Sequence, residues 1–182
     1  RSLIGLMALA GASMLSSAPA FAEYPTKPIS LVAPYGPGGA SDLAARTLAS
    51  SVPAYLGNAV IVTNRTGAAG VVGSTYVAKG RADGYTLLLA RVGSQVGVPA
   101  LNTKIPYKWD DFTFLGLLEL NPFVLVVNPK GKYKTFADLE AAVKAGEKVS
   151  YSSAGVGTLL HIAVAVFADA LGADFNKLKH VP

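Results

Sequence analysis

The stretch "PISLVAPYGPGGASDLAAR", residues 28–46, joins a short apolar run to a glycine-rich bend and then to an amphipathic segment. The apolar run lies between two prolines and is rich in aliphatic residues, which is typical of a buried strand. After the bend, Ser41 stands at the expected N-cap of a helix, and Asp42 stands in its first turn, where a carboxylate suits the helix dipole. We therefore predict a strand, a bend and a helix, with Pro53 ending or kinking the helix before Gly57 closes it.

The same order of elements repeats along the next part of the chain. A second strand is predicted at 59–64, and "RTGAAGVVG" at 65–73 is a second glycine bend that leads into a helical stretch around 72–78. "DGYTLLLA" at 83–90 predicts a turn dipeptide followed by a third strand that ends near Ala90. Strands that alternate with helices through short bends predict an α/β fold, with a parallel sheet and helices on its faces.

The middle of the chain departs from this rhythm. "FTFLGLLEL" at 112–120 and "FVLVVN" at 123–128 predict two strands that meet at an Asn-Pro turn, with no helix between them. They fit either a hairpin or a crossover between domains, and we favour the crossover. We accordingly expect domain 1 at 23–121 and domain 2 at 122–182.

The alternating rhythm restarts after the crossover. "KTFADLEAAVKAG" predicts a helix with Thr135 and Asp138 in a capping-box pattern, and "KVSYSS" predicts a strand. The third glycine bend, "AGVGT", precedes an apolar stripe from 159 to 170 that predicts a helix. "NKLKHVP" resembles the start of a strand with nothing after it to pair with, so we expect the chain to be truncated at this end.

Residues 1–22 have the pattern of a secretory signal peptide. A run of apolar and small residues is followed by "SSAPAFA", which places Ala20 and Ala22 in the A-x-A arrangement of a cleavage site. A membrane anchor is the alternative, but the run is short of the roughly 20 residues that cross a bilayer. The chain begins at Arg1 and lacks most of the usual basic stretch, so its front also resembles a clipped sequence. We expect a secreted, soluble mature chain that starts at Glu23.

Composition excludes several classes of site. The chain has no cysteine, which excludes thiolate zinc sites, disulfides and thiol nucleophiles, and its two histidines disfavour a multi-histidine metal site. The formal net charge of +5 comes with scattered lysines and no dense basic block, so we expect no nucleic-acid partner. With 51% hydrophobic residues, the chain has enough apolar material for a buried core.

The first and third glycine bends have the features of anion sites. In an open parallel sheet, ligands bind outside the carboxyl ends of the strands, where loops lead into helix N-termini. Both "YGPGGAS" and "SSAGVGT" offer backbone N–H groups and hydroxyls there. Two such bends facing each other would clamp one small anion. The alternative is that they are ordinary punctuation of an α/β chain.

Motifs for catalysis are missing. Neither bend carries the lysine of a phosphate-binding loop, "GVGTLL" lacks the third glycine of a dinucleotide fingerprint, and no serine stands in G-x-S-x-G. Arg91 directly follows a predicted strand and is a candidate to grip a carboxylate, or else a surface arginine. His161 falls in a first helical turn and fits a place in the cleft as well as a half-buried position.

Taken together, these motifs resemble a known family. "YPTKPISLVAPYGPGGASDLAAR", "NRTGAAGVVG", "ADGYTLLLA", "LVVNP" and "VSYSSAGVGTLLH" are similar, in order and spacing, to the substrate-binding proteins of tripartite tricarboxylate transporters, the Bug family of periplasmic receptors. The resemblance implies a type II periplasmic binding protein with two doubly wound domains and a ligand cleft between them. It also implies a monomeric carrier, without cofactor or catalysis, that passes a small organic carboxylate to membrane permease subunits.

The resemblance also implies which residues hold the ligand. One jaw would consist of Tyr35, Gly38, Gly39, Ala40 and Ser41, and the other of Ser152, Ser153, Gly157, Thr158 and His161. Asp42 matches an acidic position for which we prefer a helix-capping role.

The chain departs from the family pattern at two places. Arg91 replaces a small hydroxyl residue that relatives often carry, which makes a di- or tricarboxylate more attractive than a monocarboxylate. The family continues past "HVP", so we expect this chain alone not to form the complete closed cleft. A secreted α/β enzyme acting on a small acidic substrate is the alternative function, and a dinucleotide-binding domain is a third.

Overall fold

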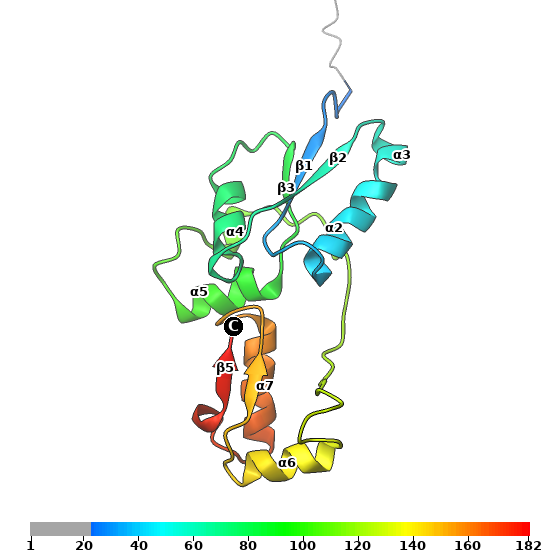
Figure 1. Ribbon diagram of the computed structural model, residues 1–182. Helices are drawn as coiled ribbons and strands as arrows, with labels where there is room; N and C mark the ends of the chain where they lie inside the picture. Colours follow the sequence, from blue (N-terminus) through cyan, green and yellow to red (C-terminus); the bar gives the residue numbers. More distant parts are fainter. Residues whose placement is uncertain (1–22) are drawn as a thin grey trace, which may run out of the picture.

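The computed structural model describes residues 23–182, so the predicted signal peptide lies outside the described residues. A three-stranded parallel sheet forms the first part of the molecule (Figure 1), with β1 (Ile29–Ala33) between β2 (Val60–Asn64) and β3 (Thr86–Leu88). The central strand is almost fully buried, which matches its uninterrupted apolar sequence. The predicted parallel α/β sheet is confirmed.

Helices cover both faces of this sheet. The connection from β1 to β2 runs through α2 (Ala40–Ser51) and α3 (Pro53–Leu56), and the connection from β2 to β3 runs through η2 (Ala68–Gly70) and α4 (Val71–Ala78). These two connections cross the sheet in opposite directions, so right-handed crossovers place α2 and α4 on opposite faces, as Figure 1 shows. The core cluster beneath α2 consists of Leu31, Ala33, Ala44, Ala45 and Leu89.

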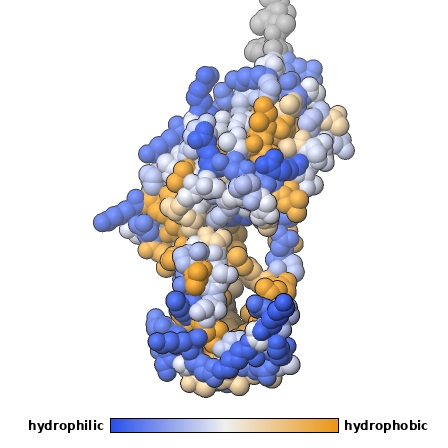
Figure 2. Space-filling view, in the orientation of Figure 1, coloured by the Kyte–Doolittle hydropathy of each residue, from blue (hydrophilic) through white to orange (hydrophobic). Residues whose placement is uncertain are grey.

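Prolines and glycines punctuate these elements as predicted. Pro53 occupies the first turn of α3, directly after α2 ends, and Gly57 closes α3 in the left-handed region with φ 69°. Beyond β3 the chain forms a π-helical turn, η3 (Gly93–Gly97), then α5 (Val98–Leu101) and η4 (Trp109–Asp111). Figure 2 shows hydrophobic residues on the flank around α5, where Val96 and Leu101 are exposed.

The second part of the molecule holds the remaining elements. They are α6 (Phe136–Lys144), β4 (Ser150–Ser152), α7 (Leu159–Ala170), η5 (Phe175–Lys177) and β5 (Lys179–Val181). The predicted cap of α6 is confirmed, because Thr135 accepts from the Asp138 N–H while the Asp138 side chain accepts from the Thr135 N–H. The expectation of an unpaired last strand was wrong, since β5 pairs in parallel with β4.

The two strands predicted at 112–120 and 123–128 are also absent. Within the described residues, 112–128 form neither helix nor strand, and most of their apolar side chains are exposed, among them Leu115 and Val126. Figure 1 shows this segment as part of the chain that runs from the first sheet to the second part, without a hairpin. An apolar run becomes a strand only where a neighbouring backbone accepts and donates its hydrogen bonds. It pairs with no strand of either sheet.

Among residues 23–182, no helix combines the length and the apolar composition that spanning a membrane requires.

Candidate functional site

The first bend leaves β1 at its carboxyl end and enters α2. Residues 36–40 are exposed, and Gly38 has φ 79°, a left-handed conformation that favours glycine. The N-cap of α2 is Gly39, so the prediction of Ser41 as the cap was wrong. Because the helix begins at Ala40, Ser41 falls within its first turn, where it is buried. The bend therefore presents exposed backbone in front of a helix N-terminus.

Asp42 holds this bend in place. Its carboxylate accepts from the Gly38 N–H at 2.9 Å, from Arg46 Nε at 2.9 Å and from Asn64 Nδ2 at 2.9 Å. These hydrogen bonds, that from Arg46 foremost, hold the pKa of Asp42 well below its usual range. This contact differs from the helix-capping role that we preferred for Asp42, because Gly38 lies one residue before the N-cap Gly39 and Asp42 instead fixes the bend in front of α2. Its acceptor oxygens are occupied by the chain itself.

The bend at 67–70 lies against the first bend, a contact that the sequence interpretation did not include in the site. Ala68 and Ala69 have φ 47° and 54°, so this turn holds non-glycine residues in the left-handed region. The Tyr35 hydroxyl donates to the Ala69 carbonyl at 3.0 Å, and burial raises the pKa of Tyr35. A Cβ on Gly70 would lie 2.8 Å from Ser94 Cβ and 3.1 Å from the Tyr35 ring, so only glycine fits there. The glycines at every third position of "GAAGVVG" were the sequence feature that could have indicated this close packing.

Arg91 lies at the same end of the sheet. Its Nε donates to Ser41 Oγ at 2.8 Å, and its Nη1 lies 2.5 Å from Glu119 Oε1 as an ion pair. The backbone carbonyl of Arg91 accepts from the Ser94 hydroxyl and from the Gln95 N–H, which anchors the residue to η3. Arg91 is therefore not the free surface arginine of the alternative interpretation. It stands beside the first turn of α2, where the first bend ends.

The second bend, residues 153–158, leads from β4 into α7. Ser153 Oγ accepts from the Gly155 N–H at 3.1 Å, and Thr158 Oγ1 donates to the Gly155 carbonyl at 2.7 Å. Gly155 and Gly157 have φ 120° and 81°, and Thr158 is the buried N-cap of α7. Ser152 is exposed at the end of β4. The hydroxyls of Ser153 and Thr158 thus stabilise the conformation of the bend through hydrogen bonds to its own backbone.

Both histidines of the chain meet beside this bend. The rings of His161 and His180 have centroids 4.7 Å apart, and Tyr151 stacks on His180 at 4.9 Å. His180 Nε2 lies 2.7 Å from Ser153 Oγ, and the Gly157 N–H points to His161 Nδ1 at 3.5 Å. Burial, and then repulsion from His180, lower the pKa of His161. His161 is accordingly half-buried and favoured in its neutral form.

The two bends are joined through a scaffold between them. A Cβ on Gly93 would lie 3.0 Å from Thr158 Cα, one on Gly97 would overlap the Gly157 carbonyl oxygen, and one on Gly155 would lie 3.0 Å from Ala69 Cβ. The turn η3 and the bend at 67–70 therefore pack directly on the second bend. Among residues 23–182, no hydrogen bond joins the first bend to the second.

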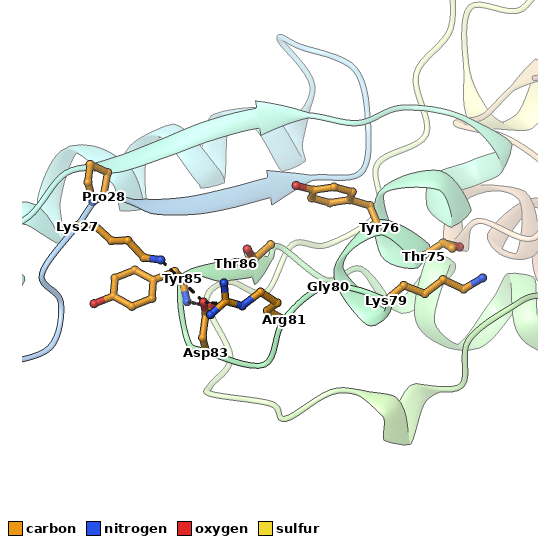
Figure 3. Close-up of a pocket in the computed structure, with 10 residues that line it drawn as sticks. All are labelled: Lys27, Pro28, Thr75, Tyr76, Lys79, Gly80, Arg81, Asp83, Tyr85 and Thr86. Carbon is orange, nitrogen blue, oxygen red and sulfur yellow. Dashed lines mark hydrogen bonds and ion pairs between the residues drawn. The ribbon is translucent and has the colours of Figure 1, made fainter.

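A separate pocket of about 640 Å³ lies at the amino ends of β1 and β3 and contains none of the predicted site residues. Figure 3 shows Lys27 and Arg81 pointing toward Asp83, at 3.9 Å and 3.6 Å, with Lys27 over the Tyr85 ring. Since Asp83 offsets part of this positive charge, the pocket is not our candidate site. In the part of the chain that the structure describes, no group of three metal-ligating side chains occurs.

Known proteins share sequence with most of this chain. Residues 44–182 match the tripartite tricarboxylate transporter family receptor. Protein BugT from Bordetella pertussis is 38% identical over 169 residues, covering 90% of this chain and 52% of that protein. A protein from the tcbD-tcbE intergenic region of a Pseudomonas species is 35% identical, covering 100% of this chain and 54% of that protein. The chain thus spans about half the length of the curated relatives it matches.

Solved structures of periplasmic binding proteins are also similar to this chain. The periplasmic binding protein BugD is 31% identical with a TM-score of 0.71, covering 87% of this chain and 52% of that one. MatC from Rhodopseudomonas palustris, solved with bound malate, is 27% identical with a TM-score of 0.78, covering 87% of this chain and 54% of that one. The chain therefore belongs to the receptor family of the tripartite tricarboxylate transporters, and its α/β fold is that of these periplasmic binding proteins.

Proposed function

We propose that the protein is a periplasmic solute receptor that binds a small organic carboxylate and delivers it to the membrane permease subunits of a tripartite tricarboxylate transporter. The ligand is held between the first bend (Tyr35, Gly38, Gly39, Ala40, Ser41) and the second (Ser152, Ser153, Gly157, Thr158, His161). The proposal is supported by family membership and by MatC, a relative that binds malate.

The observation that carries the proposal is the assembly of two helix N-termini around one scaffold. The bends before α2 and α7 both pack on the 67–70 bend and η3, through Tyr35 and Ser94 on one side and Thr158 on the other. Each bend brings backbone N–H groups to the positive end of a helix dipole, which favours a carboxylate. The domains at 23–121 and 122–182 are the two halves that close on it.

We expect Arg91 to make the receptor prefer di- and tricarboxylates over monocarboxylates. A guanidinium beside the first turn of α2 is placed to meet the second carboxylate of a ligand whose first carboxylate lies at the bends. Binding and release, without chemistry, are the whole of the proposed activity. The alternative, a secreted enzyme acting on a small acidic substrate, requires the bound ligand to be consumed.

A thermal-shift screen of the natural protein, expressed from its complete gene, tests the function. Mono-, di- and tricarboxylates are compared with nucleotides, and each ligand that stabilises the protein is then assayed for turnover. We expect a higher melting temperature with di- or tricarboxylates and no conversion of them. Stabilisation by nucleotides alone, or conversion of a hit, would overturn the proposal.

Two glycines of the first bend supply a matched pair of variants. A Cβ would meet open space at both Gly36 and Gly38, but only Gly38 has a left-handed φ. An alanine at residue 38 is disfavoured in the left-handed conformation by about 1–2 kcal/mol, so the exposed bend of Gly38→Ala should relax in the free protein, and restoring its shape for the ligand should lower carboxylate affinity by up to roughly fivefold to thirtyfold. Gly36→Ala should retain most of the affinity. Equal effects of the two substitutions would place the ligand elsewhere.

A further inference from the structure

The guanidinium of Arg91 is only partly paired. Nε donates to Ser41 Oγ, and Nη1 forms the ion pair with Glu119 Oε1 without hydrogen-bond geometry, so that both Nη2 and Glu119 Oε1 are buried without a hydrogen-bond partner. The side chains of Arg91 and Glu119 are 24% and 30% exposed, so the pair lies largely out of water. A buried donor without a partner is unfavourable, and an acceptor that reached it would relieve this cost.

The second member of the pair comes from a distant part of the chain. Glu119 belongs to the segment 112–128 that runs from the first sheet toward the second part, and it shares with Arg91 a groove of about 670 Å³ along β3. Asp42, next to Ser41 in the sequence, does not pair with Arg91, because its carboxylate oxygens accept from Gly38, Arg46 and Asn64. Within residues 23–182, Glu119 is therefore the carboxylate that neutralises Arg91.

This pairing matters for an incoming carboxylate. Carboxylates bind guanidinium groups most strongly through two parallel N–H donors, but Glu119 approaches only Nη1. A ligand carboxylate at Nη2 would meet Glu119 both as a competitor for the same guanidinium and as a like charge at close range. Glu119 therefore weakens any second carboxylate of the ligand more than the first, which lies at the bends.

We propose that Glu119 is a specificity-determining residue that competes with the distal carboxylate of the ligand for Arg91. This inference rests on the proposed function and extends it, because it assigns the preference between mono- and dicarboxylates to the Arg91–Glu119 pair rather than to Arg91 alone. Removing the charge at residue 119 frees Nη1 and Nη2 together for a two-pronged contact.

The test compares chain-matched ligands on the natural protein expressed from its complete gene. Dissociation constants are measured by calorimetry for dicarboxylates of three to six carbons and for the monocarboxylates of equal length, with wild type and Glu119→Gln. We expect Glu119→Gln to tighten the best dicarboxylate on the order of tenfold and its matched monocarboxylate far less. In Arg91→Ala, the same substitution at residue 119 should no longer change the ratio.

The control is Glu140→Gln, which removes an equal charge from α6, where Glu140 pairs with Lys144. It should leave the ratio unchanged. An equal effect of Glu119→Gln on both ligand classes, or weaker dicarboxylate binding, would overturn the inference while leaving the receptor function intact. A wild type that binds no carboxylate would overturn the proposed function and the inference with it. Glu119→Asp, which keeps the charge, should stay near wild type.

Discussion

Substituting Gly97 with alanine tests the contact on which the candidate site depends. Gly97 is the last residue of η3 and has helical angles, φ −63° and ψ −51°, so an alanine there has no backbone strain. Its methyl group, however, would overlap the carbonyl oxygen of Gly157 in the second bend and would lie 3.2 Å from Ile162 Cδ1. The oxygen belongs to backbone, so relief requires η3 and the bend to move apart.

Two opposing effects set the size of the change. Replacing glycine by alanine within a helix is worth about 1 kcal/mol in favour of folding. Forcing an extra methyl group into a close-packed contact is unfavourable by roughly 1–3 kcal/mol. Because the overlap is with backbone rather than with a flexible side chain, we take the upper part of this range. The expected net loss is about 1–2 kcal/mol, which lowers the melting temperature by a few degrees in a chain of this size.

Calorimetric melting and amide hydrogen exchange of the natural protein check this expectation. Gly97→Ala should melt earlier than wild type, and the amides of residues 155–158 should exchange faster, because the bend loses its support. Gly116→Ala is the control, since a Cβ there meets open space. A Gly97→Ala protein that is more stable than wild type, with unchanged exchange at 155–158, would refute the packing of η3 on the second bend.

Three further predictions concern the capping, acidic and histidine groups. Thr135→Ala removes the N-cap of α6 and should destabilise the protein by about 1 kcal/mol in urea unfolding, while Thr135→Ser should restore most of the loss. The pKa of Asp42 is lowered in the folded state, so the stability that its carboxylate contributes is present above the ordinary pKa of 3.8 and is lost as the pH falls below it. Asp42→Asn should therefore lower the melting temperature at pH 7 and flatten the decline of the melting temperature below pH 4. The pKa of His161 is also lowered in the folded state, so the stability of the protein should fall as the pH drops below the ordinary pKa of 6.5. In melts between pH 5 and 8, His161→Asn should reduce this fall. A melting temperature that depends on pH as steeply in His161→Asn as in wild type would contradict the prediction.

Much of the fold was predictable because its signals are local. The apolar run of β1, the proline after α2 and the left-handed glycine at residue 57 each act within a few residues of the chain. The capping box of Thr135 and Asp138 is equally local. Such signals depend on the conformations that each residue type allows, so they remain readable without knowledge of the packing partner.

The failures share one physical cause, which is dependence on residues far along the chain. Segment 112–128 has the composition of strands, but its backbone pairs with no strand of either sheet. Ser41 has the chemistry of an N-cap, but its hydroxyl accepts from Arg91, and the N-cap is Gly39, two residues earlier. The predicted last strand was expected to be unpaired because no sequence follows it, but its partner, β4, lies about 30 residues before it. Pairing across such distances leaves little mark on either local sequence.

The charges around the bends show why backbone, rather than side chains, should dominate ligand binding. Asp42 is paired with Arg46, and Arg91 is paired with Glu119, so these four side chains leave no net charge beside the first bend. At the second bend, the lowered pKa of His161 favours its neutral form. The remaining positive potential then comes from the N-termini of α2 and α7, and the first bend adds exposed backbone to it. In the receptor function that we propose, the geometry of these donors would recognise the first carboxylate of the ligand, and the Arg91–Glu119 pair would set the preference for a second one.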